Sequence, residues 1–81
     1  MNITFLRKPA AMSALGIKAA STFYLRIQQG LMTSPVHLGP RTVGFPKHEI
    51  EAINSARLAG KPEDEIRQLV ASLEAARKLA A

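Results

Sequence analysis

The positions of glycine and proline divide this chain into short segments, and this division constrains its fold more than any other feature. Three glycines follow apolar, helix-like stretches, at Gly16, Gly30 and Gly60. Three prolines stand where a helix would begin, at Pro9, Pro46 and Pro62. Glycine adopts the left-handed conformation that ends many helices, and proline is tolerated in the first helical turn. The pattern therefore predicts a mostly helical chain of short elements.

Two short helices joined by a glycine-containing turn are expected in the first thirty residues. The first spans about 8–15, and its inward-facing side chains are Met12 and Leu15. The second is capped by Ser21 or Thr22 and ends at Gly30. Its apolar stripe at helical spacing consists of Phe23, Tyr24 and Ile27. This arrangement is what a helix-turn-helix requires.

A β-hairpin is expected directly after the second helix. Val36–Leu38 and Thr42–Phe45 form two short strands around the turn Gly39-Pro40-Arg41. A hairpin beside a helix-turn-helix is a wing, and this one carries Arg41 at its tip. The apolar stretch 3–6 is either a brief strand or an extended lead-in.

Two further helices are expected in the C-terminal part. One begins at Pro46 and ends at Gly60, with Ile50, Ile53, Ala56 and Arg57 at helical spacing. The last begins at Lys61-Pro62, where three acidic residues favour the positive end of the helix dipole. Its apolar stripe consists of Ile66, Leu69, Leu73, Ala76 and Ala80, with Val70 beside it. The stripe either packs back onto the domain or pairs with a second copy of the chain as a short coiled coil.

The expected fold is mostly α: a winged helix-turn-helix with a short two-stranded β-hairpin wing and two C-terminal helices. Residues 1–58 form the winged helix-turn-helix domain in this interpretation. Residues 59–81 form a C-terminal helical extension that serves packing or dimerisation.

Charge is distributed unevenly along the 81 residues. The formal net charge is +5, yet the first 48 residues contain no Asp or Glu. They contain six basic residues, Arg7, Lys8, Lys18, Arg26, Arg41 and Lys47. From Glu49 onward, six acids oppose five bases. A basic surface without a partner is one interpretation. A polyanion partner for the first half is the better one, because each phosphate neutralised by Lys or Arg releases condensed counterions.

The second helix is the candidate reader of double-stranded DNA. Arginine bonds guanine O6 and N7 as a pair, glutamine does the same to adenine, and hydroxyls near a helix N-terminus bind phosphate. Arg41 at the wing tip is expected to contact phosphate or the adjacent minor groove. Further candidates for phosphate contacts are Lys47, His37, Arg7 and Lys8. The predicted DNA-binding residues are Lys18, Ser21, Thr22, Leu25, Arg26, Gln29, Arg41 and Lys47.

An enzyme, a metal site and a cofactor are not expected. The chain has no cysteine, and His37 and His48 lie eleven positions apart without the spacing of a helical zinc pair. Every carboxylate lies in the last 33 residues, on helices expected to be rich in solvated charge. No apolar run approaches the ~20 residues of a transmembrane helix, so a cytoplasmic protein is expected.

Several stretches carry a family resemblance, most specifically Leu38–Phe45. They are F-L-R-K-P-A-A-M-S-A-L-G-I, S-T-F-Y, Q-Q-G, P-V-H-L-G-P-R-T-V-G-F and H-E-I-E-A-I. Together they resemble the AlpA-like phage regulators, which belong to the MerR-like and excisionase-like winged helix-turn-helix proteins. The resemblance covers Phe5 to about Ile53, and Gly60–Arg67 resembles an extension that many such proteins carry.

The resemblance implies a transcription regulator of a prophage or mobile element, or alternatively an excision factor that acts beside an integrase. It places the recognition helix on Ser21–Gln29 and the wing on Val36–Phe45. Phe45 stands where the family usually has tryptophan, and it is expected to anchor the wing to the core.

The chain departs from the family pattern in the turn and on the recognition helix. The turn is one residue longer than the usual Gly-Leu-Ser-Arg-Ser-Thr, and alanine replaces its arginine at Ala19 or Ala20. Leu25-Arg26 reverses the common arginine-leucine order, so a leucine stands where a DNA-facing arginine is expected. A function of another class also remains open, namely a protein-interaction module that assembles through the last helix.

Overall fold

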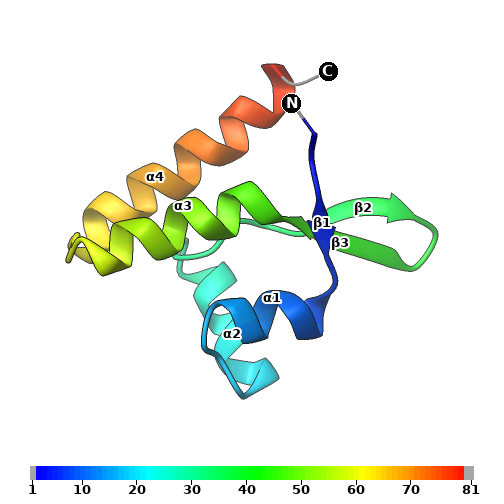
Figure 1. The fold of residues 1–81 in the computed structure, drawn as a ribbon, viewed down its shortest axis with the longest axis horizontal. Helices are drawn as coiled ribbons and strands as arrows, with labels where there is room; N and C mark the ends of the chain where they lie inside the picture. Colours follow the sequence, from blue (N-terminus) through cyan, green and yellow to red (C-terminus); the bar gives the residue numbers. More distant parts are fainter. Residues whose placement is uncertain (1, 80–81) are drawn as a thin grey trace.

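A computed structural model describes residues 2–79 of the chain, which are mostly helical (Figure 1). The elements in chain order are strand β1 (Phe5–Leu6), helix α1 (Lys8–Ala14), helix α2 (Ala20–Gln28), strand β2 (Val36–Gly39), strand β3 (Thr42–Pro46), helix α3 (Lys47–Leu58), helix α4 (Glu63–Ala76) and the 3₁₀ helix η1 (Arg77–Leu79). The expected winged helix-turn-helix with two C-terminal helices is confirmed. Across residues 2–79, no helix is long and apolar enough to cross a membrane.

The two helices of the helix-turn-helix begin and end close to the predicted positions, except for the start of α2. Ala19, and not Ser21 or Thr22, is the N-cap of α2, and no side-chain oxygen among the described residues caps it. The prediction of the cap was wrong because the turn closes early. Ile17 is buried, and its N–H donates to the Met12 carbonyl oxygen at 2.9 Å.

The wing belongs to a small antiparallel sheet with the strand order β1-β3-β2. The prediction of a two-stranded sheet was therefore incomplete. The stretch before α1 pairs with β3 as a third strand, with Phe5 opposite Pro46. Gly44 in β3 permits this crowding. A Cβ atom there would lie 2.7 Å from Leu38 Cδ1 and 3.0 Å from Phe5 Cβ, so any side chain would displace both neighbours.

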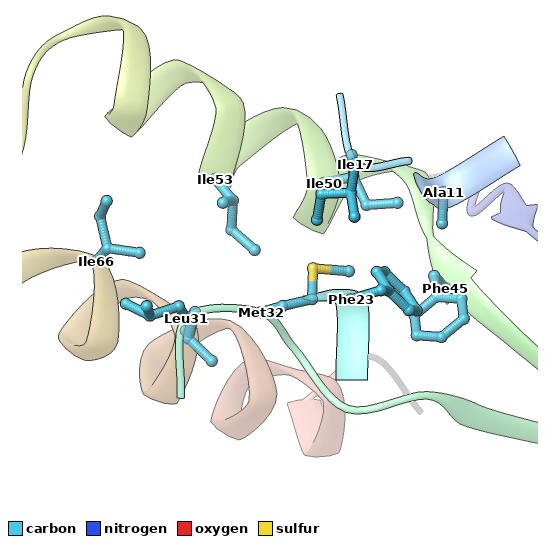
Figure 2. Packing of buried hydrophobic residues seen from close by; sticks show 10 residues of the cluster. Ala11, Ile17, Phe23, Leu31, Met32, Phe45, Ile50, Ile53 and Ile66 are labelled. Atoms are coloured by element: carbon cyan, nitrogen blue, oxygen red, sulfur yellow. The ribbon is translucent and has the colours of Figure 1, made fainter. Parts of the chain in front are cut away.

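One hydrophobic core joins the elements of both halves of the chain. Its buried members are Ala11, Ile17, Phe23, Leu31, Met32, Phe45, Ile50, Ile53, Ile66 and Val70. Figure 2 shows the aromatic pair of α2 and β3 at one end, Ile66 of α4 at the other end, and Met32 between them. Phe45 is 2% exposed and meets Phe23 edge-on at 5.1 Å between ring centroids, as expected for the residue that anchors the wing.

The last helix packs back onto the domain, which was one of the two alternatives for its apolar stripe. Ile66 and Val70 are buried in the common core, and Leu69 and Leu73 pack against it. Ala76 is exposed, contrary to the expected stripe, because the chain leaves the α-helix there and continues as η1. Ala80, also assigned to the stripe, lies outside the described residues.

Candidate nucleic-acid interface

Helix α2 is attached to the body by one face and exposes the other. Phe23 is fully buried and Ile27 packs partly buried against the core. Residues two positions apart on an α-helix point about 200° apart. Leu25 lies between these two residues and therefore points away from the body, with 49% of its surface exposed.

The outward face of α2 consists of two neighbouring ridges. The first contains Ser21, Leu25 and Gln28, which are exposed and follow the i, i+4, i+7 spacing of one helix face. The second contains Thr22, Arg26 and Gln29 at the same spacing. Arg26 is half-buried, so this second ridge lies nearer to the body. Sequence reasoning missed Gln28, although its position three residues after Leu25 would have placed it on the outward face.

The dimensions of α2 suit the major groove of DNA. An α-helix with its side chains is about 10–12 Å in diameter, and the major groove of B-DNA is about 12 Å wide. Within residues 2–79 no side chain caps the first turn, so its backbone N–H groups remain available to an external acceptor. Ser21 and Thr22 add two exposed hydroxyl groups to the same turn.

Side chains from the two C-terminal helices fix the ends of the helix-turn-helix. Arg67 Nε on α4 donates to the Gln29 carbonyl oxygen at 2.8 Å, at the C-terminal end of α2. Asn54 Nδ2 on α3 donates to the Ala14 carbonyl oxygen at 3.0 Å, at the end of α1. Each contact satisfies a carbonyl group that has no partner within its own helix. The pair α1 and α2 is thereby held against the body.

Tyr24 differs from its predicted position in the apolar stripe, because half of its surface is exposed. Its hydroxyl accepts a hydrogen bond from Lys8 Nζ at 3.0 Å, and the same ammonium group lies 5.1 Å from its ring centroid. A tyrosine can keep its ring against the helix pair and its hydroxyl in water. The contact places the positive charge of Lys8 beside the outward face of α2.

Arg41 occupies the tip of the wing in a backbone conformation that arginine rarely adopts. Its φ is +61°, and it follows Pro40 in the two-residue loop between β2 and β3. Proline is common at the first central position of a type II turn, and the second central position requires a positive φ, for which glycine is favoured. Arg41 is exposed. The backbone of the turn favours glycine at position 41, so the conformation of the turn does not explain why arginine is present there.

The structure leaves the basic residues of the first half without acidic partners. The salt bridges within residues 2–79 join Lys61 to Glu65, Arg67 to Glu63 and Asp64, and Arg77 to Glu49. The basic residues before Glu49 take part in none of them: Arg7, Lys8, Lys18, Arg26, Arg41 and Lys47. The charge separation along the sequence persists in the fold, because within residues 2–79 salt bridges form only from Glu49 onward, at three of the five later basic residues, Lys61, Arg67 and Arg77.

The predicted site residues lie on four separate parts of the fold. Most of them lie on or directly after α2, namely Ser21, Thr22, Leu25, Arg26 and Gln29. Lys18 is exposed in the turn before α2, Arg41 is at the wing tip, and Lys47 is the exposed first residue of α3. No hydrogen bond among the described residues joins these three side chains to α2. The contact of Phe23 with Phe45 is what places α2 beside the base of the wing.

Glu49 contradicts the expectation that every carboxylate is solvated. It is fully buried, and its two oxygens accept hydrogen bonds from Arg77 Nε at 2.9 Å and Nη2 at 2.7 Å. The hydrogen bond to Glu49 raises the pKa of Arg77, and the negative charges of Glu49 and Glu74 raise it further against an opposing effect of burial. The carboxylate thus has a structural role, which ties η1 to the start of α3.

Comparison with protein-family models, with curated proteins and with solved structures finds no match to this chain. Within residues 2–79, no three His, Cys, Asp or Glu side chains gather at a potential metal site. Since the comparisons find no match, the class of this protein is defined by its fold. It is a mostly helical winged helix-turn-helix, and the six basic residues before Glu49 form no salt bridge within residues 2–79.

Proposed function

We propose that this protein binds double-stranded DNA, with α2 in the major groove and the wing against the neighbouring backbone. The observation that carries the proposal is the set of six basic residues on the helix-turn-helix, the wing and the start of α3. They form no salt bridge within residues 2–79, whereas Lys61, Arg67 and Arg77 of the second half pair with acidic residues. Unpaired cations around an exposed helix are what a phosphate backbone requires.

The proposed biological role is transcription control of a prophage or mobile element in the bacterial cytoplasm. It rests on the resemblance to the AlpA-like regulators together with the winged helix-turn-helix fold. A promoter–reporter strain without integrase tests this role, since a regulator changes promoter output under these conditions. An excision factor would leave the output unchanged and would act only when integrase is present.

Binding is expected to weaken steeply with salt. If Lys18, Arg26, Arg41 and Lys47 each neutralise one phosphate, log K should fall against log salt with a slope of roughly −3.6, a loss of about 150-fold between 50 and 200 mM salt. A mobility-shift titration of the intact chain on duplex DNA measures this slope. A protein-interaction module would bind no duplex or respond weakly to salt, and either result would contradict the proposal.

Arg41→Gly is expected to weaken DNA binding without destabilising the fold. Arg41 has a positive φ that is strained for arginine and not for glycine, so the substitution removes strain from the folded state. This gain offsets the larger conformational entropy that glycine gives the unfolded chain. The free energy of unfolding should therefore stay within about 1 kcal/mol of its original value. Affinity for specific and random duplexes should fall to a similar extent, and the salt slope should decrease by about 1.

The matched control for Arg41→Gly is Lys61→Ala, which removes a cation that pairs with Glu65 on α4. Both variants lose one positive charge, so a general effect of net charge would weaken both equally. The proposed role of the wing requires the larger loss for Arg41→Gly. Equal affinities of the two variants would show that the wing tip does not touch DNA.

A further inference from the structure

We propose that Leu25 reads the methyl group of a thymine, and that the DNA site of this protein therefore contains an A·T pair opposite the middle of α2. This inference rests on the proposed function and names the base that the helix selects. It starts from the outward ridge of Ser21, Leu25 and Gln28, which is uncharged and exposed.

The position of Leu25 distinguishes it from other exposed leucines of the chain. Leu58 and Leu79 are more exposed, at 92% and 87%, but they end α3 and η1. Exposure of a single leucine is common on protein surfaces and indicates nothing by itself. Leu25 instead stands in the middle of α2, two residues from the buried Phe23 and on the opposite side of the helix.

Charged groups lie beside this ridge and not on it. Lys8 is held beside one flank by its hydrogen bond to Tyr24, and the half-buried Arg26 lies on the other flank. Flanking cations suit the two phosphate backbones that border a groove, whereas the neutral ridge between them faces the base edges. Leu25 is the apolar member of that ridge, and Ser21 and Gln28 are its hydrogen-bonding members.

The chemistry of the major groove then selects the base. Guanine, adenine and cytosine present hydrogen-bonding groups there, and thymine adds a methyl group. A leucine placed against a donor or acceptor would remove water from it without supplying a hydrogen bond, which is unfavourable. Against a thymine methyl group the same side chain buries apolar surface on both partners. Thymine is therefore the base that Leu25 favours.

The test is a thymine-to-deoxyuridine scan of a bound duplex. The intact chain first selects its site from a pool of random duplexes, and each thymine of that site is then replaced in turn by deoxyuridine, which pairs identically but lacks the methyl group. Fluorescence anisotropy measures the affinities. Removal of one methyl group is expected to weaken binding about fourfold, which corresponds to one apolar group of that size left unburied.

Leu25→Ala should bind the thymine and deoxyuridine duplexes with equal affinity at that position. The matched control is Leu58→Ala, which removes another exposed leucine side chain at the end of α3 and should keep the fourfold difference. Thermal unfolding of both variants checks that each remains folded. The inference is overturned if no thymine methyl group matters, or if Leu25→Ala keeps the full difference, while DNA binding itself persists. Failure of the original chain to bind any duplex would overturn the proposed function together with this inference.

Discussion

Arg77→Met is expected to lower the free energy of unfolding by about 3–5 kcal/mol, because it leaves a buried carboxylate without its charged partner. Glu49 is fully buried and receives two hydrogen bonds from the Arg77 guanidinium group. Arg77 Nη2 also donates to the Ser34 carbonyl oxygen at 2.7 Å, so the substitution removes a third contact. A chain of 81 residues has a total stability on the order of 4–12 kcal/mol, and much of it would be lost. Urea unfolding followed by circular dichroism measures the change.

The control is an exposed ion pair of the same chain. Lys61 Nζ lies 3.8 Å from Glu65 Oε1, and about half of each side chain is exposed. Lys61→Met should therefore cost less than about 1 kcal/mol. The double variant Glu49→Leu/Arg77→Met should recover part of the loss, because it removes the unpaired charge. If Arg77→Met cost no more than Lys61→Met, the buried carboxylate would not depend on this pair.

The direction of the pKa shift of Arg77 determines how the contribution of Arg77 to stability changes at high pH. Its hydrogen bond to Glu49 raises the folded-state pKa above the ordinary value of arginine. The contribution to stability is therefore fully present below that ordinary value and is lost as the pH rises through the higher folded-state pKa. Raising the pH from neutral to moderately alkaline values should leave the contribution of Arg77 unchanged.

The helix boundaries could be predicted from the sequence because they depend on local backbone preferences. Gly16, Gly30 and Gly60 all have φ between +73° and +77°, which is the conformation that makes glycine a helix terminator. The hairpin was predicted on the same local basis, from Gly39-Pro40 between two apolar strands. The burial of Phe23 was correctly predicted from helical spacing. The burial of Phe45 was correctly predicted from the family resemblance.

The elements that the sequence did not predict depend on contacts between distant segments. The pairing of Phe5 with Pro46 and the ion pair of Glu49 with Arg77 have no periodicity that would reveal them. No place in the core was predicted for the segment 31–33, yet its three residues are all buried in the structure. They are buried because α4 packs back over them. The apolar stripe of α4 was equally compatible with pairing to a second copy of the chain, so this packing could not be predicted.

The candidate site was predicted in outline but not in its arrangement. The sequence correctly assigned the outward direction to Leu25, since its neighbours at two positions on either side are apolar. It could not show that Arg26 is half-buried, because this depends on how far α2 is turned against the body. The burial of Phe23 determines that rotation, so the orientation of the candidate site depends on Phe23.

Phe23→Ala is expected to lower the free energy of unfolding by about 3–5 kcal/mol and to abolish the proposed sequence-specific DNA binding. Within residues 20–28, Phe23 is the fully buried side chain, and its ring contacts that of Phe45. The substitution leaves a cavity between α2 and the wing and removes the contact that orients the outward ridge. The midpoint of thermal unfolding should fall by more than about 12 °C for a domain of this size. Circular dichroism and anisotropy measure the two effects.

Phe23→Leu separates the loss of orientation from the loss of folding. Leucine retains an apolar side chain at the site but not the edge-on aromatic contact, so most of the chain should remain folded while α2 is less firmly oriented. Affinity for the selected duplex should then fall more than affinity for random DNA, because base contacts depend on the angle of the helix and phosphate contacts depend on it less. Ile66→Val is the control, since it shortens a buried side chain of α4 at the other end of the core (Figure 2) and should cost about 1 kcal/mol without turning α2. Equal losses on both duplexes for folded Phe23→Leu would mean that the orientation of α2 does not determine which sequence is bound.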